Sequence, residues 1–283
     1  MIRIASMVGA PDLETPTLAT HRGDLAEACS QLHELGFDGI ELMIRRPADL
    51  DDDTVRQSLA GANIALVALC TGHVFAEDHL GLVTPEVEIS QEAYARLLEF
   101  VQAASRWIGP GGMVNIGRAR GLGDPLRPAE SLDCLREALQ QLADDAAPHA
   151  IRLTLEPVSK TETSFVHSTQ DGLEMVRRVN RPNLGLILDT YHMYREDADP
   201  LASLREAREV LWHVHISDAN RRWPGSDAIP FEQVVETLQD IRYDGYLGLE
   251  IQPWPEPLVA AQQSILNLRK WIGASNDRRK TWQ

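Results

Sequence analysis

Several features that mark other classes of protein are missing from this sequence. Its 283 residues include 3 cysteines, which are far apart and show no CxxC spacing, so that reduced thiols are expected. No apolar run approaches the roughly 18 residues that a membrane-spanning helix needs. The short apolar start is soon followed by acidic residues, unlike a secretory signal. A cytoplasmic protein with no membrane partner is therefore expected.

Positive charge is also scarce. Lys and Arg number 27 against 42 Asp and Glu, which gives a formal net charge of -15. Proteins that bind nucleic acid present a basic face, so nucleic acid is not an expected partner. An anionic small molecule is still compatible with this charge, because a few local arginines can reverse the field inside one cleft.

The sequence is instead rich in short apolar runs that alternate with amphipathic helical stretches. Near-continuous hydrophobicity is typical of parallel strands that are covered on both faces. Eight such strands are predicted, at Ile2–Val8, Gly39–Met43, Ala65–Leu69, Gly112–Ile116, Ile151–Leu155, Gly185–Leu188, Trp212–Ile216 and Leu247–Ile251.

This alternation, with no flexible linker, predicts an α/β protein that forms a single (β/α)8 TIM barrel. The catalytic barrel is expected to span residues 1–274, followed by a polar C-terminal tail over residues 275–283. A doubly wound open sheet is the structural alternative, but its GxGxxG turn is absent after the first strand.

Four consecutive strands of the predicted barrel deliver polar side chains to their carboxyl ends. They are Glu156 after IRLTL, Asp189 after GLIL, His215 in WHVHIS and Glu250 after LGL. Active sites of such barrels lie at this rim. Three crowded carboxylates repel one another unless a divalent cation compensates their charge. One cation is therefore expected, Mn²⁺ foremost, with Mg²⁺ or Co²⁺ as alternatives, and the absence of thiolate ligands argues against structural zinc.

Further polar residues follow these strands in the loops where a substrate would lie. Glu162 comes six residues after Glu156, His192 three after Asp189, and Arg221 six after His215. Loops at the active rim carry function, which makes the three residues candidate substrate contacts. Solvent contact, a hydrogen-bonded loop histidine and a surface ion pair, respectively, are the alternatives.

The same stretches carry a family resemblance. The sequence resembles the xylose-isomerase-like sugar isomerases and epimerases, especially their ketose 3-epimerase branch, in LEPVSKTETSF, LDTYHM, HVHISDANRRWPGSDAIPF and GLEIQP. The stretches GDLAEAC, GFDGIEL, CTGHVFAEDHLGLVTP and NIGRARG, together with HISDANRRWPG, are most similar to the 5-keto-L-gluconate (ketouronate) epimerases. The likeness runs over nearly the whole chain, to about residue 270.

The resemblance implies roles for individual residues. Glu156, Asp189, His215 and Glu250 would bind the metal, and Glu156 and Glu250 would also be the catalytic acid–base pair. Glu162, His192 and Arg221 would hold substrate oxygens. The sequence departs from the family at PGSDA (residues 224–228), where relatives have PGxG followed by His, and at His73, where ketouronate epimerases have Gln.

Three more residues are candidate substrate contacts. Arg118 and Arg120 follow the fourth strand in NIGRARG and could clamp a carboxylate or phosphate by paired hydrogen bonds. An inward-pointing arginine would favour a sugar acid over a neutral ketose, whereas solvent exposure or pairing with an acid such as Asp124 is the alternative. His73 follows the third strand, where a rim histidine satisfied by the protein itself is equally compatible with the sequence.

The expected function is a divalent-metal-dependent epimerase, or isomerase, of a keto sugar or keto sugar acid. It would remove the proton α to the ketone through a metal-stabilised enediolate. A metal-dependent lyase of the same superfamily, similar to inosose dehydratases or C-glycoside-cleaving enzymes, is the alternative. An apurinic endonuclease disagrees with the net charge. Relatives often form dimers or tetramers, so a homo-oligomer is also expected.

Overall fold

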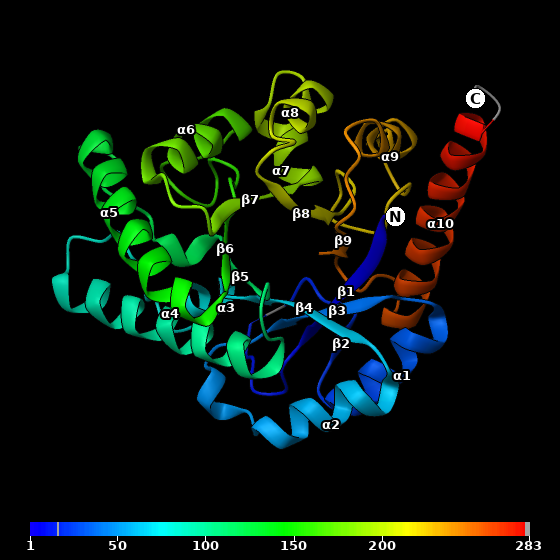
Figure 1. Ribbon diagram of the computed structural model, residues 1–283, viewed down its shortest axis with the longest axis horizontal. Coiled ribbons are helices and arrows are strands. Elements are labelled where there is room, and N and C mark those ends of the chain that lie inside the picture. Colours follow the sequence, from blue (N-terminus) through cyan, green and yellow to red (C-terminus); the bar gives the residue numbers. More distant parts are fainter. Residues whose placement is uncertain (16, 281–283) are drawn as a thin grey trace.

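The computed structural model describes residues 1–15 and 17–280 and forms a closed barrel of parallel strands inside a ring of helices (Figure 1). Neighbouring barrel strands follow chain order, with β1 beside β3 and then each strand beside the next up to β9, and β1 pairs with β9 to close the barrel. The barrel strands are β1 (Arg3–Gly9), β3 (Gly39–Met43), β4 (Ala65–Cys70), β5 (Met113–Ile116), β6 (Arg152–Leu155), β7 (Leu184–Asp189), β8 (Leu211–Ile216) and β9 (Tyr246–Leu249). The prediction of a (β/α)8 TIM barrel is confirmed.

All eight predicted strands are present, and their bounds differ from the predicted ones by two residues or fewer. β3 has the predicted bounds, and all five of its residues are buried. The largest difference lies in the last strand, which ends at Leu249 rather than Ile251. A short strand that the apolar runs did not indicate, β2 (His21–Arg22), pairs with β1 outside the barrel.

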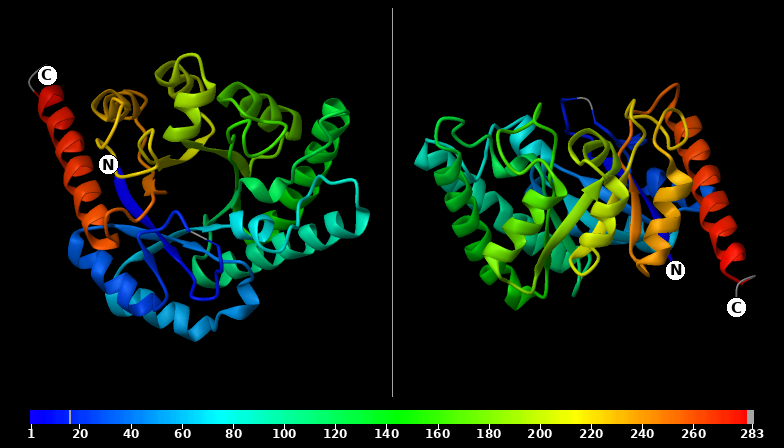
Figure 2. Two further views of the ribbon diagram at one scale, coloured as in Figure 1. Left: turned by 180° about the vertical axis from the view of Figure 1, so that it is seen from behind. Right: turned by 90° about the horizontal axis from the view of Figure 1, so that it is seen from above.

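The helices surround the barrel and cover the outer faces of its strands (Figure 2). Their ends follow local capping rules. Asp24 caps α1 by accepting from Glu27 N at 2.9 Å, and Gly36 ends that helix with φ 93°. The helices are α1 (Leu25–Leu35), α2 (Asp52–Ala62), α3 (Gly72–Ala76), α4 (Val87–Trp107), α5 (Pro128–Ala146), α6 (Thr169–Val179), α7 (Thr190–Glu196), α8 (Pro200–Glu206), α9 (Phe231–Asp240) and α10 (Pro257–Lys280).

The last helix closes the ring, because α10 packs beside both α9 and α1 (Figure 1). It continues through Lys280, so the segment from residue 275 that was expected to be a polar tail is helical to that point. Residues 281–283 lie outside the described part of the chain. Among the described residues, no helix has both the length and the apolar character that crossing a bilayer requires.

Candidate functional site

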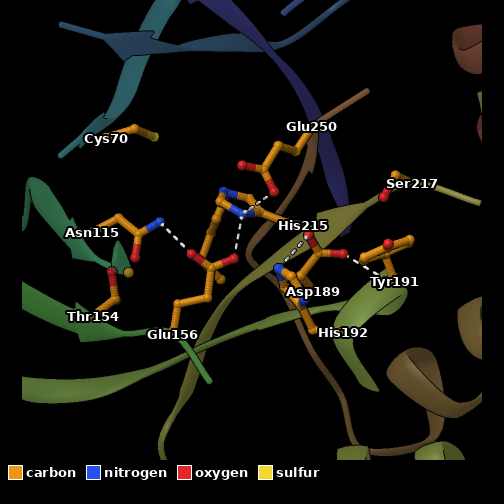
Figure 3. A network of polar contacts seen from close by, with 12 residues as sticks. Cys70, Asn115, Thr154, Glu156, Asp189, Tyr191, His192, His215, Ser217 and Glu250 are labelled. Atoms are coloured by element: carbon orange, nitrogen blue, oxygen red, sulfur yellow. Dashed lines mark hydrogen bonds and ion pairs between the residues drawn. The ribbon is translucent and has the colours of Figure 1, made fainter. Parts of the chain in front are cut away.

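The four polar strand ends meet at the carboxyl rim of the barrel (Figure 3). Each contributes one ligand atom, and these atoms all lie within 4.8 Å of one another. His215 Nδ1 lies 3.2 Å from Glu156 Oε1 and 3.5 Å from Glu250 Oε2. Asp189 and His215 are fully buried, and Glu156 is 5% exposed. The predicted cluster therefore exists as a compact group of one imidazole and three carboxyl groups.

The sheet register brings the cluster together. Asp189 and His215 are direct partners in the pairing of β7 with β8. The backbone N–H of Glu250 donates to Ile216 O at 3.2 Å, which places Glu250 level with the end of β8. In the same way, the N–H of Glu156 donates to Ile116 O at 3.1 Å. Parallel strands that end at one level present their last side chains to one space.

The donor set and its spacing suit a divalent cation. Carboxylate oxygens and imidazole nitrogens are ligands of Mn²⁺, Mg²⁺ and Co²⁺. Oxygen ligands on opposite sides of a Mg²⁺ ion are about 4 Å apart, and the ligand atoms of this cluster all lie within 4.8 Å of one another. The four residues could thus hold one ion after small side-chain movements.

The carboxyl groups of the cluster differ in their electrostatic environments. Burial raises the pKa of Asp189 despite the opposing charge of Arg221. Burial also favours the neutral form of Glu250, but Arg221 and His215 outweigh it and lower the Glu250 pKa. Burial alone would lower the pKa of His215, whereas the surrounding carboxylates, Glu41 foremost, raise it. Negative charge therefore dominates the cluster, and a cation would be attracted to it.

Arg221 supplies positive charge at the edge of the cluster. Its Nη1 contacts Asp189 Oδ2 and lies 3.1 Å from Glu250 Oε2 and 2.9 Å from Ser217 Oγ. Its Nη2 lies 3.0 Å from His192 Nε2. Ser159 fixes the other side of this histidine, with Oγ 2.7 Å from Nδ1. Burial lowers the pKa of His192 to about 3, so that the ring is neutral.

The loop that carries Arg221 is organised by a buried carboxylate. Asp218 is fully buried and accepts four backbone N–H groups at 2.8–3.0 Å. They belong to Ala219, Gly225, Asp227 and Ile229. Arg221 itself has φ 59°, and its N–H donates to Asp218 O at 2.8 Å. Asp218 therefore holds the backbone conformation from which Arg221 reaches the cluster.

A cavity of about 290 Å³ opens above the cluster. Glu156 and Glu250 line it, together with five of the expected substrate contacts, namely Glu162, His192, Arg221, His73 and Arg118. Glu162 is placed between two of the others, with Oε2 3.8 Å from Arg118 Nε and Oε1 3.7 Å from His192 Nε2. Burial raises the pKa of Glu162. The cavity thus joins the cluster to a wall of charged and polar groups.

Comparison with known proteins agrees with this architecture. Residues 29–271 match the family model of the xylose isomerase-like TIM barrel. The chain belongs to that family. It is 29% identical to a ketose 3-epimerase of Arthrobacter globiformis over 77% of this chain and 74% of the other. It is 26% identical to a D-psicose 3-epimerase of Ruminiclostridium cellulolyticum over 86% and 82%.

A solved structure shows the same fold. The 3-keto-D-glucoside 4-epimerase of E. coli superposes with a TM-score of 0.80 at 20% identity, over 95% of this chain and all of the other. The expected relationship to xylose isomerase-like proteins, with ketose 3-epimerases among the relatives, is confirmed. The finer likeness to ketouronate epimerases stays a prediction.

Arg120, one of the expected substrate contacts, does not line the cavity. Arg120 is fully buried, and among the described residues those that line the cavity do not include it. Its guanidinium donates to the backbone oxygens of Gly117, Glu156, Phe165 and Val166 at 2.5–3.3 Å and to Thr163 Oγ1. Burial lowers its pKa to about 10. The geometry disfavours the expected role, because both Nη groups of Arg120 already donate to oxygens of the protein itself.

His73 has a partner that the sequence reading missed. Its Nδ1 lies 3.2 Å from Glu77 Oε1 and 3.1 Å from Thr15 Oγ1, and burial lowers its pKa. Thr15 Oγ1 donates to the same Glu77 oxygen at 2.8 Å. The ring is thus held by the protein through Nδ1 while the residue lines the cavity. The i, i+4 spacing of His73 and Glu77 was the available signal.

Three other residues that the sequence did not indicate contact members of the cluster. Asn115 of β5 donates from Nδ2 to Glu156 Oε2 at 3.2 Å, as Figure 3 shows. A Cβ at Gly117 would lie 2.8 Å from the same Glu156 oxygen, so this position leaves room for the carboxylate. Glu41, in the middle of β3, contacts His215 from the barrel interior. No local pattern marks these residues, because each acts on a strand distant in sequence.

Proposed function

We propose that this protein is a divalent-metal-dependent epimerase of a keto sugar or keto sugar acid. The observation that carries the proposal is the four-residue cluster within 4.8 Å at the base of the cavity. Two of its carboxyl groups, Glu156 and Glu250, also line the cavity and so can reach a bound substrate. A cluster closed off from the cavity would instead favour a structural ion.

The relatives support a carbohydrate substrate. Those reported above are named as epimerases of a ketose, of D-psicose and of a 3-keto-D-glucoside. All three names describe enzymes that act on carbohydrates. The carbon that is inverted differs between the 3-epimerases and the 4-epimerase. In both cases it is next to a ketone, whose α-proton is acidic enough to be removed by a carboxylate.

The acid–base roles fall to the two carboxylates that line the cavity. One takes the proton from the carbon next to the ketone, and the other returns a proton to the opposite face, which inverts that carbon. A divalent cation bound by the cluster supplies Lewis-acid stabilisation of the negative charge that develops on the ketone oxygen. Asn115 holds one oxygen of Glu156 in place by donating from Nδ2, which keeps this base oriented toward the cavity.

The polar wall of the cavity would hold the rest of the substrate. Arg221 and His192 lie next to the cluster, where they can bind the oxygens of the reacting carbons. Glu162 and Arg118 lie opposite each other at 3.8 Å and can bind more distant hydroxyl groups. With His73, these residues account for the proposed substrate contacts. A sugar acid would require Arg118 to leave Glu162 for the substrate carboxylate, whereas a neutral sugar leaves their pair intact.

The preferred ion, the location and the assembly complete the proposal. Mn²⁺ is the proposed ion, with Mg²⁺ and Co²⁺ as substitutes that have the same oxygen and imidazole ligands. Cys29, Cys70 and Cys134 are all unpaired, which is compatible with the proposed cytoplasmic location. A dimer or tetramer is the proposed assembly, which sedimentation velocity would test.

Proton NMR in D₂O tests the proposed function. Mg²⁺-loaded protein is incubated with tagaturonate, fructuronate, tagatose, fructose and an inosose, since Mn²⁺ would broaden the lines. The expected result is loss of the signal α to the ketone of one substrate, with a second stereoisomer appearing at the same mass. A dehydrated product would support the lyase alternative. Absence of α-proton exchange with every substrate would overturn the epimerase.

A matched variant pair shows whether the signal belongs to the cluster. Glu156→Gln keeps the size of the side chain but removes one of the two acid–base groups, so formation of the second stereoisomer should fall by roughly 10²–10⁴-fold. Glu137→Gln makes the same chemical change on α5, where the side chain is 69% exposed and pairs with Arg136. It should epimerise like the wild type. Equal epimerisation by both variants would mean that Glu156 is not one of the two groups.

A further inference from the structure

Glu41 lies inside the barrel, beneath the cluster, and binds two histidines at once. It is fully buried in the middle of β3, a strand that contributes no residue to the cluster itself. Its Oε1 lies 2.7 Å from His213 Nε2, and its Oε2 lies 3.1 Å from His215 Nε2. The thiol of Cys70 donates to Oε2 at 3.6 Å. The Glu41 carboxylate thus contacts two histidines of β8 and a cysteine of β4.

The two nitrogens of His215 face different partners. Nε2 points to Glu41, and Nδ1 points to Glu156 and Glu250, as the upper part of Figure 3 shows for the latter two. An ionised carboxylate accepts hydrogen bonds and cannot donate. Glu156 and Glu250 belong to the proposed cation cluster, whereas Glu41 lies on the other side of the ring and can accept the proton of Nε2. A proton on Nε2 leaves the lone pair of the neutral ring on Nδ1 for the cation. Only a nitrogen with a free lone pair can bind a cation.

We propose that Glu41 is a positioning residue that fixes the ring plane and tautomer of His215, so that Nδ1 is presented to the divalent cation. The inference rests on the proposed cation site. Carboxylates that hold the second nitrogen of a ligating histidine orient the ring and make it a stronger ligand. Glu41 does this without reaching the cation or the substrate.

The surroundings of Glu41 are built to hold it in this position. Gly248 of β9 pairs with His215 in the sheet. A Cβ at Gly248 would collide with Glu41 Oε1 and would lie 2.8 Å from His213 Nε2. His213 and His215 are two residues apart on β8, so both point to the same face of the strand. Their rings are nearly perpendicular, at 89°, and each presents Nε2 to one oxygen of Glu41.

A second cation bound by Glu41, His213 and His215 is the competing interpretation, because these residues also form a compact group of ligand types. The distances favour hydrogen bonds. Both Nε2 atoms already lie at hydrogen-bond distance from the carboxylate, and a cation between them would need lone pairs where the protons lie. Protein with two bound ions would contradict the proposal.

The first test uses wild-type protein loaded with diamagnetic Mg²⁺. In ¹⁵N-detected NMR, the imidazole nitrogens of His215 should show a protonated Nε2 and an unprotonated Nδ1. The spectrum does not depend on activity or on a variant that folds. A ring with its proton on Nδ1 would overturn the inference.

The second test measures cation affinity by calorimetric titration of Mn²⁺ into metal-free protein. Glu41→Gln replaces one accepting oxygen with an amide that donates, and it should weaken binding by about 10–100-fold. Glu77→Gln is the matched control, because Glu77 also pairs with a histidine, His73, at 3.2 Å but does not contact the cluster. It should bind Mn²⁺ like the wild type.

The outcomes separate this inference from the proposed function. If wild-type protein binds no divalent cation, the proposed function fails. If the wild type binds one ion and Glu41→Gln binds it equally well, the cation site stands and the positioning role fails. A wild type that binds two ions, one of them lost in Glu41→Gln, would assign Glu41 to a second metal site instead. Circular dichroism of each variant verifies the fold.

Discussion

His215 Nδ1 lies 3.2 Å from Glu156 Oε1, although the two residues are 59 positions apart in the sequence. β7 lies between their strands in the barrel, so the contact spans the interior and not one edge of the sheet. Glu250, which directly follows β9, reaches the same nitrogen. The nitrogen thus marks the centre of the site, with a carboxyl group on either side.

If Glu156 and Glu250 act on opposite faces of the substrate, Glu156→Gln and Glu250→Gln should each lose α-proton exchange with a different epimer. Each variant should lose epimerisation by roughly 10²–10⁴-fold, because inversion needs both carboxylates. Each should still exchange the α-proton of one epimer with D₂O, since the remaining base serves one face. The epimer that exchanges should differ between the two variants. NMR of both pure epimers measures this, and identical exchange patterns would contradict separate faces.

Removal of the charge of Arg120 should lower the stability of the protein, whereas removal of the charge of Arg118 should affect substrate binding. Arg120→Met leaves several buried oxygens without their donor and should lower the free energy of unfolding by about 3–5 kcal/mol. Arg118 is 39% exposed, so Arg118→Met should change stability by about 0.5 kcal/mol or less. If Arg118 binds substrate, its variant should instead raise KM with kcat little changed.

Urea unfolding and steady-state kinetics of the two arginine variants provide the measurement. A stable, folded Arg120→Met with raised KM would return Arg120 to the substrate contacts. An Arg118→Met variant with wild-type KM for every substrate would remove Arg118 from them. Each arginine is thus the control for the other.

Stability should fall on acidification because of His73. Burial lowers its pKa below the ordinary value of about 6.5, so the unfolded chain takes up the proton first as pH falls. Unfolding then becomes easier by up to about 1.4 kcal/mol per pH unit, from about pH 6.5 down to the lowered pKa of the folded state. Above about pH 6.5 both states are neutral at His73, and this contribution does not change with pH.

Urea unfolding of the wild type and His73→Gln at several pH values isolates that contribution. The free energy of unfolding of the variant should decrease less steeply between pH 6.5 and 5.5. His33→Gln changes an exposed histidine in the last turn of α1 and controls for the loss of a histidine in general. Parallel curves for wild type and His73→Gln would contradict the assignment.

Asp218 should affect catalysis through the loop that it anchors. Asp218→Ala removes the acceptor of four backbone N–H groups and should lower stability by about 2–4 kcal/mol. Because Arg221 follows in the same loop, KM should rise as well. Urea unfolding and kinetics measure the two effects. Asp227→Ala makes the same chemical change in the same loop without removing an anchor, and unchanged KM in both variants would show that Arg221 keeps its place without Asp218.

Local sequence was enough to predict the barrel and to identify the candidate metal ligands. Buried parallel strands must be apolar along their whole length, so eight such runs with helices between them leave few alternatives to a closed barrel. The groups at the strand ends stand out against those runs. Glu156, Asp189, His215 and Glu250 could be identified because a polar side chain at the end of an apolar strand is a local signal.

Tertiary structure decided which polar residues face the cavity and which support it. Arg118 and Arg120 are two residues apart in NIGRARG, yet one lines the cavity and the other is enclosed by backbone oxygens. The 3₁₀ turn over Arg118–Arg120 points their side chains differently, and its backbone is held by hydrogen bonds from Leu82 and Val83, which are distant in sequence. Glu41 joins the site from a strand 174 positions away from His215. Sequence determines what each strand can offer, whereas closure of the barrel determines which side chains meet.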